Sequence, residues 1–320
     1  MMNHTKEQLQ TLHKSPWQRF LINFKKNWQL HLMVLLPLAY LLTFNYGPMY
    51  GVQIAFKEYR PRAGIWGSDW VGLKQYETFF SNYKWTVYVK NTLTISLYSI
   101  AAGFPVPIIL ALILHVNEND RLKKLTQNVS YLPHFISVVV MVGILNQLLS
   151  PVSGLYGVVM HALGFDVVPD LQGDPDAFYH LMVWSGVWQN MGWSTIMYVA
   201  ALSAVSPDLH EAAKLDGASR WKRVLHVDLP SIMPTICMML ILRFGSIMEV
   251  GYEKTYLMQT PTNLEKSEVI STYVFKNGIA DANYSYGTAV DLMNSVITII
   301  LVNLVNWITN KLSDGENGLF

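Results

Sequence analysis

Residues 211–234, with the sequence EAAKLDGASRWKRVLHVDLPSIMP, place a charged segment between two long apolar stretches of the chain. Just before this segment, Ser206 suits a helix N-cap and Pro207 suits the first helical position. Gly217 is the residue type most often found at a left-handed helix C-cap. These signals predict a short helix over residues 207–216 that ends in a sharp turn.

A second short helix is predicted over residues 219–227, where basic and apolar side chains are mixed. The sequence Asp228-Leu229-Pro230 is expected to end this helix and start the next apolar stretch, because proline lacks a backbone N–H. The small side chains of Ala212 and Ala213 would allow another backbone to approach closely. From these residues alone, the two helices either dock onto a partner or merely connect two spans.

The composition indicates a membrane protein. Of the 320 residues, 51% are apolar or aromatic and only 14% are charged, whereas soluble domains average about 25% charged residues. The net charge of +1 offers no basic surface for nucleic acid. The single cysteine, Cys237, excludes a disulfide framework within the chain and a site built from several cysteines.

Six stretches have the apolar character of membrane spans, since a bilayer core needs about 20 apolar helical residues. The fourth is the weakest, because Gln189, Asn190 and Gly192 interrupt it, and we expect it to face a polar interior. We therefore predict an all-α integral membrane protein with six transmembrane helices in one domain, residues 29–310. The predicted spans are 29–49, 88–115, 130–149, 180–204, 231–250 and 287–308.

The distribution of lysine and arginine predicts the orientation, because cytoplasmic segments are enriched in both. With the N-terminus inside, the inner segments carry thirteen of these residues and the outer segments eight. The first span is expected to be retained, since no small-residue cleavage site follows it. Residues 1–28, the loop 206–230 and the tail 311–320 are then cytoplasmic.

No motif for independent chemistry is present in the sequence. It has neither a phosphate-binding GxxxxGK[ST] loop nor an HExxH zinc motif, and its nine histidines are scattered. We therefore expect no catalytic residue, no metal site and no cofactor bound by this chain. The alternative, a membrane-embedded glycosyl-transferring enzyme, would need acidic groups at the membrane surface, and no pairing pattern joins the candidates Asp166, Asp170, Asp174 and Asp176.

The loop resembles the EAA signature of ABC-importer permeases in its residues and spacing. The matching positions are Glu211, Ala212, Ala213, Asp216, Gly217, Leu229 and Pro230. Further segments are similar to the LplB-like branch of these permeases, which takes up poly- and oligosaccharides, alginate among them. These segments are 70–76, 91–93, 131–137, 250–254, 269–275 and 289–297.

The resemblance implies a type I permease fold in a bacterial inner membrane and transport of a saccharide by alternating access. The seven loop positions would couple to two ATP-binding subunits, which hold the ATP and magnesium. A second permease, usually a different chain, and an external solute-binding protein complete the assembly that the resemblance implies. A passive channel is disfavoured, because it would leave the loop without a role.

Arg243 is the charged residue expected deepest in the membrane, about twelve residues into the fifth span and roughly 18 Å along it. Such a charge usually faces a protein interior or a water-filled path. It would either contact an acidic sugar or pair with Glu249 or a backbone carbonyl. Glu249 and Tyr252, at the outer end of this span, are placed with it in the candidate substrate path.

Trp184 and Trp188 lie four residues apart on the fourth span, close in sequence to Asn190. Indole faces stack on sugar C–H groups and amides bond hydroxyls, so these three side chains also suit a saccharide path. Interfacial tryptophan is the ordinary alternative. Asn294 in the sixth span would either line the path or hold two helices together.

Overall fold

The computed structural model describes residue 17 and residues 24–312. Most of the predicted N-terminal segment 1–28 and of the predicted tail 311–320 therefore lies outside the described residues. The described chain is helical apart from one short antiparallel pair, β1 (Lys57–Glu58) with β2 (Asp69–Trp70). This confirms the all-α fold class.

The first half of the chain forms the following elements in order. They are α3 (Trp28–Leu41), η1 (Leu42–Tyr46), α4 (Gly47–Met49), η2 (Tyr50–Phe56), α5 (Lys74–Ser81), α6 (Trp85–Gly103), α7 (Pro105–Val116), α8 (Asp120–Tyr131), η3 (Leu132–Phe135), α9 (Val138–Leu149) and α10 (Leu155–Ala162). Of these, η1 is a π-helix, whereas η2 and η3 are 3₁₀-helices.

The second half begins with α11 and ends with α19, and each of these helices has 29 residues. Its elements are α11 (Pro175–Ser203), α12 (Pro207–Leu215), α13 (Arg220–Arg223), η4 (Val224–Asp228), α14 (Leu229–Ser231), α15 (Met233–Phe244), α16 (Tyr252–Met258), α17 (Leu264–Ser267), α18 (Ile270–Val274), η5 (Phe275–Ala280) and α19 (Tyr284–Leu312). Both η4 and η5 are π-helices.

Three continuous helices among the described residues are long and apolar enough to cross a membrane: Trp28–Phe56, Trp85–Val116 and Tyr284–Lys311. Two bent helix pairs bring the number to five if each pair is one span. The fourth predicted span, α11, is not in that set although it has 29 residues. Its central amides and glycines lower its hydropathy, in keeping with the expected polar surroundings.

The bends correct the predicted third and fifth spans. The third runs as Asp120–Phe135 followed by Val138–Leu149 at 102°, so the expected inner connector 116–129 is mostly helical. The fifth was expected over 231–250, but α15 already ends at Phe244. Gly245 follows directly, and glycine is a poor helix former, so a turn replaces the predicted last helical turn.

The helix α11 lies at the centre of the fold and packs on α6 and α7. Its Gly192 allows the closest approach to a neighbour, because a Cβ there would lie 2.1 Å from the carbonyl oxygen of Ser130 on α8. Small residues bring helices together in lipid, where van der Waals packing holds them. The glycine that weakened the hydropathy of this span therefore has a packing role.

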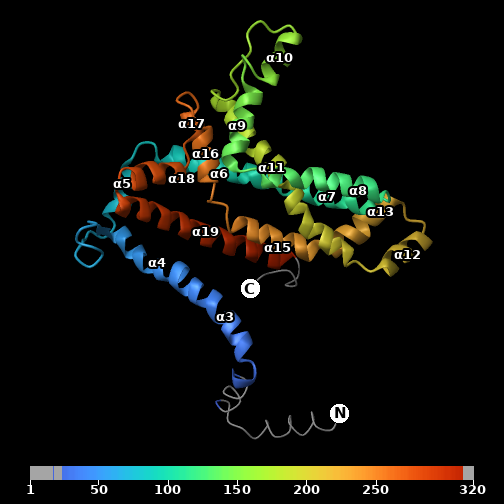
Figure 1. Cartoon of the computed structure of the whole chain (residues 1–320), viewed down its shortest axis with the longest axis horizontal. Coiled ribbons are helices and arrows are strands. Elements are labelled where there is room, and N and C mark those ends of the chain that lie inside the picture. Colours follow the sequence, from blue (N-terminus) through green and yellow to red (C-terminus); the bar gives the residue numbers. More distant parts are fainter. Residues whose placement is uncertain (1–16, 18–23, 313–320) are drawn as a thin grey trace.

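The first helix, α3, lies apart from the rest of the molecule. Figure 1 shows α3 and α4 extending away from the body in which α7, α11, α15 and α19 lie. None of the residues of α3 is buried. The surface of α3 is therefore left for lipid or for another chain.

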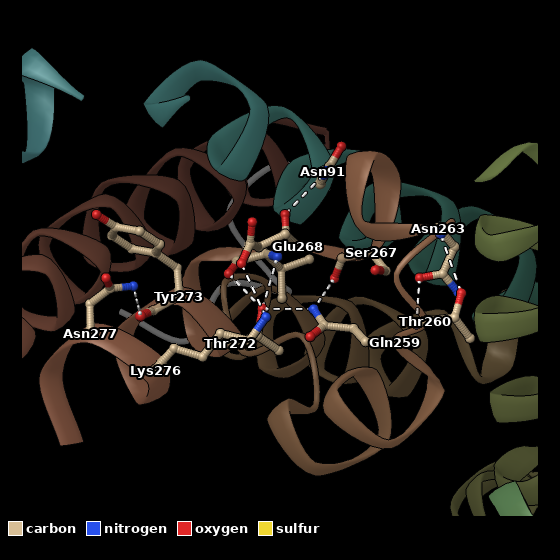
Figure 2. A network of polar contacts seen from close by, with 11 residues as sticks. Asn91, Gln259, Thr260, Asn263, Ser267, Glu268, Thr272, Tyr273, Lys276 and Asn277 are labelled. Carbon is tan, nitrogen blue, oxygen red and sulfur yellow. Dashed lines mark hydrogen bonds and ion pairs between the residues drawn. The ribbon is translucent and has the colours of Figure 1, made fainter. Parts of the chain in front are cut away.

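The segment 259–277 is fixed to the body by hydrogen bonds, as Figure 2 shows. Asn91 of α6 donates through Nδ2 to the carbonyl oxygens of Glu265 and Glu268, each at 2.9 Å. Gln259 donates to the Ser267 carbonyl oxygen at 2.9 Å, and Lys276 pairs with the Glu268 carboxylate at 3.1 Å. The asparagine of the Asn91-Thr92-Leu93 segment is thus an anchor for a later part of the chain.

Candidate functional site

The first arm of the loop 206–230 folds as its capping residues predict. The Ser206 hydroxyl accepts a hydrogen bond from the Asp208 N–H at 3.3 Å, and α12 follows. Gly217 has a φ of +74°. The N–H groups of Gly217 and Ala218 donate to the carbonyl oxygens of Lys214 and Ala213 at 3.0 and 2.9 Å, the pattern of a Schellman motif.

The second arm runs further than predicted. The helix starts at Arg220 and continues through the π-turn η4 to Ser231, so residues 228–230 do not end it. The π-turn precedes Pro230, whose ring would clash with the carbonyl four residues earlier in a regular α-helix. The break falls at Ile232, where the chain bends by 60° into α15.

The loop presents apolar side chains to the outside. Glu211, Ala212, Asp216 and Gly217 are exposed, and α12 has no buried residue. Leu209, Leu215 and Trp221 are also exposed, Leu215 to 90%. Figure 1 shows α12 at one end of the body, beside α13. Large exposed apolar side chains in a charged loop favour a protein contact surface.

A cavity with a partly polar lining lies between α6, α11, α15 and α16. It has a volume of about 400 Å³. Asn190, Arg243 and Glu249, three of the predicted path residues, line it. Further hydrogen-bonding side chains around it are Ser96, Ser99, Gln189, Ser194, Ser246 and Lys254.

Lys254 is the most constrained charge at this cavity. Its residue is 8% exposed and its Nζ donates to the Met182 carbonyl oxygen at 2.8 Å. The helix α16 lies outside the candidate spans, and burial lowers the pKa of Lys254 to about 8. A lysine in this setting favours a bound anion that would stabilise its charge.

Arg243 is the next-to-last residue of α15 and is exposed at the cavity. None of the ion pairs among residues 17 and 24–312 includes it, and Glu249 is likewise outside those pairs. The expected alternative, a pair between these two side chains, is therefore not formed in the described part of the chain. Both charges are available to a ligand or a neighbouring subunit.

The remaining predicted path residues lie outside this cavity lining. Trp184 and Trp188 are about half exposed on α11, and Trp184 donates to the Tyr98 hydroxyl at 2.8 Å. Tyr252 packs against Phe275 with ring centroids 4.6 Å apart. Asn294 is buried and its Nδ2 lies 3.4 Å from the Met248 carbonyl oxygen, an arrangement that joins α19 to the turn after α15.

Sequence reasoning did not select Lys254 as a path residue. The available signal was a lysine within the Val250–Lys254 segment, directly after an apolar stretch. Its burial depends on the turn after Phe244, which folds α16 back against α11. No local sequence pattern predicts that reversal.

Several bent or broken apolar helices, a polar interior cavity and an exposed two-helix loop define a multi-span membrane transport subunit. The chain belongs to the family of binding-protein-dependent transport system inner membrane components, whose model matches residues 103–314. It is an ABC-importer permease of the carbohydrate branch that includes LplB and YteP. The chain is a transport subunit and not an enzyme, so the glycosyl-transferring alternative is wrong.

Two relatives from Bacillus subtilis (strain 168) match almost the whole chain. The polygalacturonan/rhamnogalacturonan transport system permease protein YteP is 39% identical over 307 residues, covering 96% of this chain and 95% of YteP. Protein LplB is 38% identical over 296 residues, covering 92% of each.

Two solved structures share the fold. One is a bacterial ABC transporter involved in the import of the acidic polysaccharide alginate, with a TM-score of 0.83 and 35% identity over 92% of this chain and 99% of that one. The other is a bacterial alginate ABC transporter in complex with an alginate pentasaccharide-bound periplasmic protein, with a TM-score of 0.84 and 34% identity over 94% of this chain and all of that one.

Proposed function

We propose that this permease imports uronate-containing oligo- or polysaccharides across the inner membrane. The observation that carries the proposal is the cavity at Asn190, where Arg243 and Lys254 supply two cationic groups beside amides and hydroxyls. Cations suit the carboxylates of uronates, and amides suit their hydroxyl groups. The acidic polysaccharides named for YteP and for the alginate transporter support the same substrate class.

The energy for import comes from partner subunits in this proposal. The exposed loop 206–230 docks on an ATP-binding subunit, and ATP and magnesium are held there. Closure of the two ATP-binding subunits moves α12 to α14, and the helix that bends at Ile232 passes the movement to α15 and Arg243. Glu211, Ala212, Ala213, Asp216, Gly217, Leu229 and Pro230 form this coupling site.

The sidedness and the assembly follow the same proposal. Both termini and the loop face the cytoplasm, as the distribution of lysine and arginine predicts. A second permease, a different chain, covers the open side of the cavity, and a solute-binding protein delivers the saccharide. The complex of the alginate transporter with its periplasmic protein supports that last assignment.

Uptake by proteoliposomes containing the complete transporter tests the substrate class. We expect ATP-dependent uptake of oligogalacturonate or alginate oligosaccharides, and much weaker uptake of neutral oligosaccharides of the same length. Arg243→Gln should lower uptake of the acidic sugars. Lys90→Gln is the matched control, because Lys90 is exposed on α6 and does not line the cavity. Equal uptake of neutral and acidic sugars would overturn the proposal.

A further inference from the structure

The helices α7, α12 and α13 come together at one end of the body (Figure 1). Three side chains from distant parts of the sequence meet there. They are His115 at the end of α7, His210 on α12 and Asp228 in η4. The Nε2 atoms of His210 and His115 lie 3.1 and 3.5 Å from Asp228 Oδ1. One donor atom from each residue falls within 4.8 Å of the other two.

The cluster is polar but not internally satisfied. The Asp228 side chain is 2% exposed, and the side chains of His210 and His115 are 19% and 28% exposed. Asp228 Oδ1 and His210 Nε2 are both buried without a hydrogen-bond partner, although they are neighbours. Their N–H and lone-pair directions are therefore unsuited to each other.

A buried carboxylate without a satisfied partner is costly, and so is a buried imidazole nitrogen. Lys123 on α8 is close enough to His115 to interact with it electrostatically. Lys123 nevertheless forms no ion pair with Asp228 among the described residues. A cation between the three donor atoms would satisfy Asp228 Oδ1 and His210 Nε2 together.

We propose that His115, His210 and Asp228 bind a divalent transition-metal ion of the zinc class. Two imidazoles and a carboxylate are ligands that zinc accepts, with metal–ligand bonds of about 2.0–2.2 Å. Tetrahedral coordination at those lengths separates the ligand atoms by about 3.3 Å, close to the observed 3.1 and 3.5 Å. The partial exposure of both histidines leaves room for a water molecule as the fourth ligand.

The sequence did not predict this site, because its three residues are far apart in the chain. Zinc motifs are recognised by close spacing on one helix or loop. Here His115 and His210 come from different helices, and the π-turn η4 determines which way Asp228 points. The expectation that this chain has no metal site depended on spacing alone.

A bound ion would join both arms of the loop 206–230 to the end of α7. His210 belongs to the first arm and Asp228 to the second, whereas His115 ends a membrane-spanning helix. The metal would then make the loop and α7 move together. This role does not depend on which saccharide is transported.

Metal binding to the assembled transporter tests the proposal. The complex is purified, stripped with a chelator, dialysed and titrated with Co²⁺ while its visible ligand-field absorption is recorded. We expect the intense bands of tetrahedral Co²⁺ with one ion per copy of this chain, and displacement of Co²⁺ by Zn²⁺. Zn²⁺ should also raise the melting temperature of the complex, because a ligand of the folded state stabilises it.

His115→Gln and Asp228→Asn should each weaken binding by about tenfold or more, since even groups behind the metal ligands contribute roughly 10–100-fold. The control is His226→Gln in the same arm, because His226 is exposed and its Nδ1 contacts the Lys222 carbonyl oxygen. Co-purification of the ATP-binding subunits verifies the folding of each variant. Absence of saturable binding to the unmodified complex, or unchanged affinity in His115→Gln, would overturn the proposal.

Discussion

Lys254 is a buried charge that the fold holds at the proposed substrate cavity. Its ammonium lies at the cavity. Among the described residues, Nζ donates one hydrogen bond, to the Met182 carbonyl oxygen. Its pKa in the folded protein is about 8, below the usual 10.5. Between these two pH values the unfolded chain binds more protons, so the free energy of unfolding rises with pH there.

The charge of Lys254 also matters for the proposed substrate, because an ammonium group attracts a uronate carboxylate. Uptake of acidic saccharides should fall as the pH rises through about 8, where Lys254 loses its charge. The measurement is initial uptake by proteoliposomes as a function of external and internal pH. Lys254→Arg should remove this decline, because arginine stays protonated. An identical decline in the arginine variant would show that another group is responsible.

The absence of a side chain at Gly192 lets α11 pack closely against α8, and this leads to a prediction about stability. In Gly192→Ala the new Cβ would meet the Ser130 backbone, which cannot move aside easily. We expect destabilisation of about 1–3 kcal/mol, as for other overpacked positions. Thermal unfolding of the purified complex measures it.

The control for this change is Gly143→Ala in α9, where a Cβ has open space. Alanine favours a helix over glycine by about 1 kcal/mol, so this variant should be neutral or more stable. Equal effects of the two changes would contradict the packing role of Gly192.

The loop 206–230 is predictable in its first arm and less so in its second. Ser206, Pro207 and Gly217 act locally, and the structure places each where its capping preference predicts. The continuation of the second arm to Ser231 depends on a π-turn, which has no reliable sequence signal. Local capping chemistry is therefore a good guide here, and the helix irregularity is not.

Gly217→Asp should weaken the attachment of the ATP-binding subunits while leaving membrane insertion intact. A residue with a side chain at a φ of +74° is strained by about 1 kcal/mol or more, and the exposed surface beside it would change shape. Affinity purification of the complex measures the attachment. Gly164→Asp is the control, since Gly164 also has a positive φ, +90°, but follows α10. Normal recovery of the ATP-binding subunits with Gly217→Asp would count against the coupling role.

Asn91 joins α6 to the segment 265–268, and its substitution should lower the free energy of unfolding. Asn91→Ala leaves the carbonyl groups of Glu265 and Glu268 without its two hydrogen bonds. We expect a loss of about 1–3 kcal/mol in unfolding free energy, measured by thermal unfolding. Asn303→Ala should have little effect, because Asn303 is exposed and bonds only the Ile299 carbonyl within its own helix. Equal stability of both variants would contradict the anchor assignment.

For the molecule as a whole, hydropathy located the apolar segments but did not predict where their helices bend or end. It could not predict the 102° bend before Val138 or the early end of α15 at Phe244. Nor could it predict that Asn190, Arg243 and Glu249 share a cavity while Trp184 and Trp188 lie outside it. Each of these features depends on contacts between distant segments, whereas periodicity and composition report only on near neighbours.

The separation of α3 from the body bears on how the protein is made. This helix precedes all the spans of the body in the chain, yet no residue of the 18-residue apolar window of Trp28–Phe56 is buried. During synthesis this apolar window would enter the bilayer before the body exists, and among the described residues only η2, at the far end of the same helix, packs closely on α19. Lipid or another polypeptide could therefore cover α3, and its exposure to lipid would differ between the isolated chain and the assembled complex.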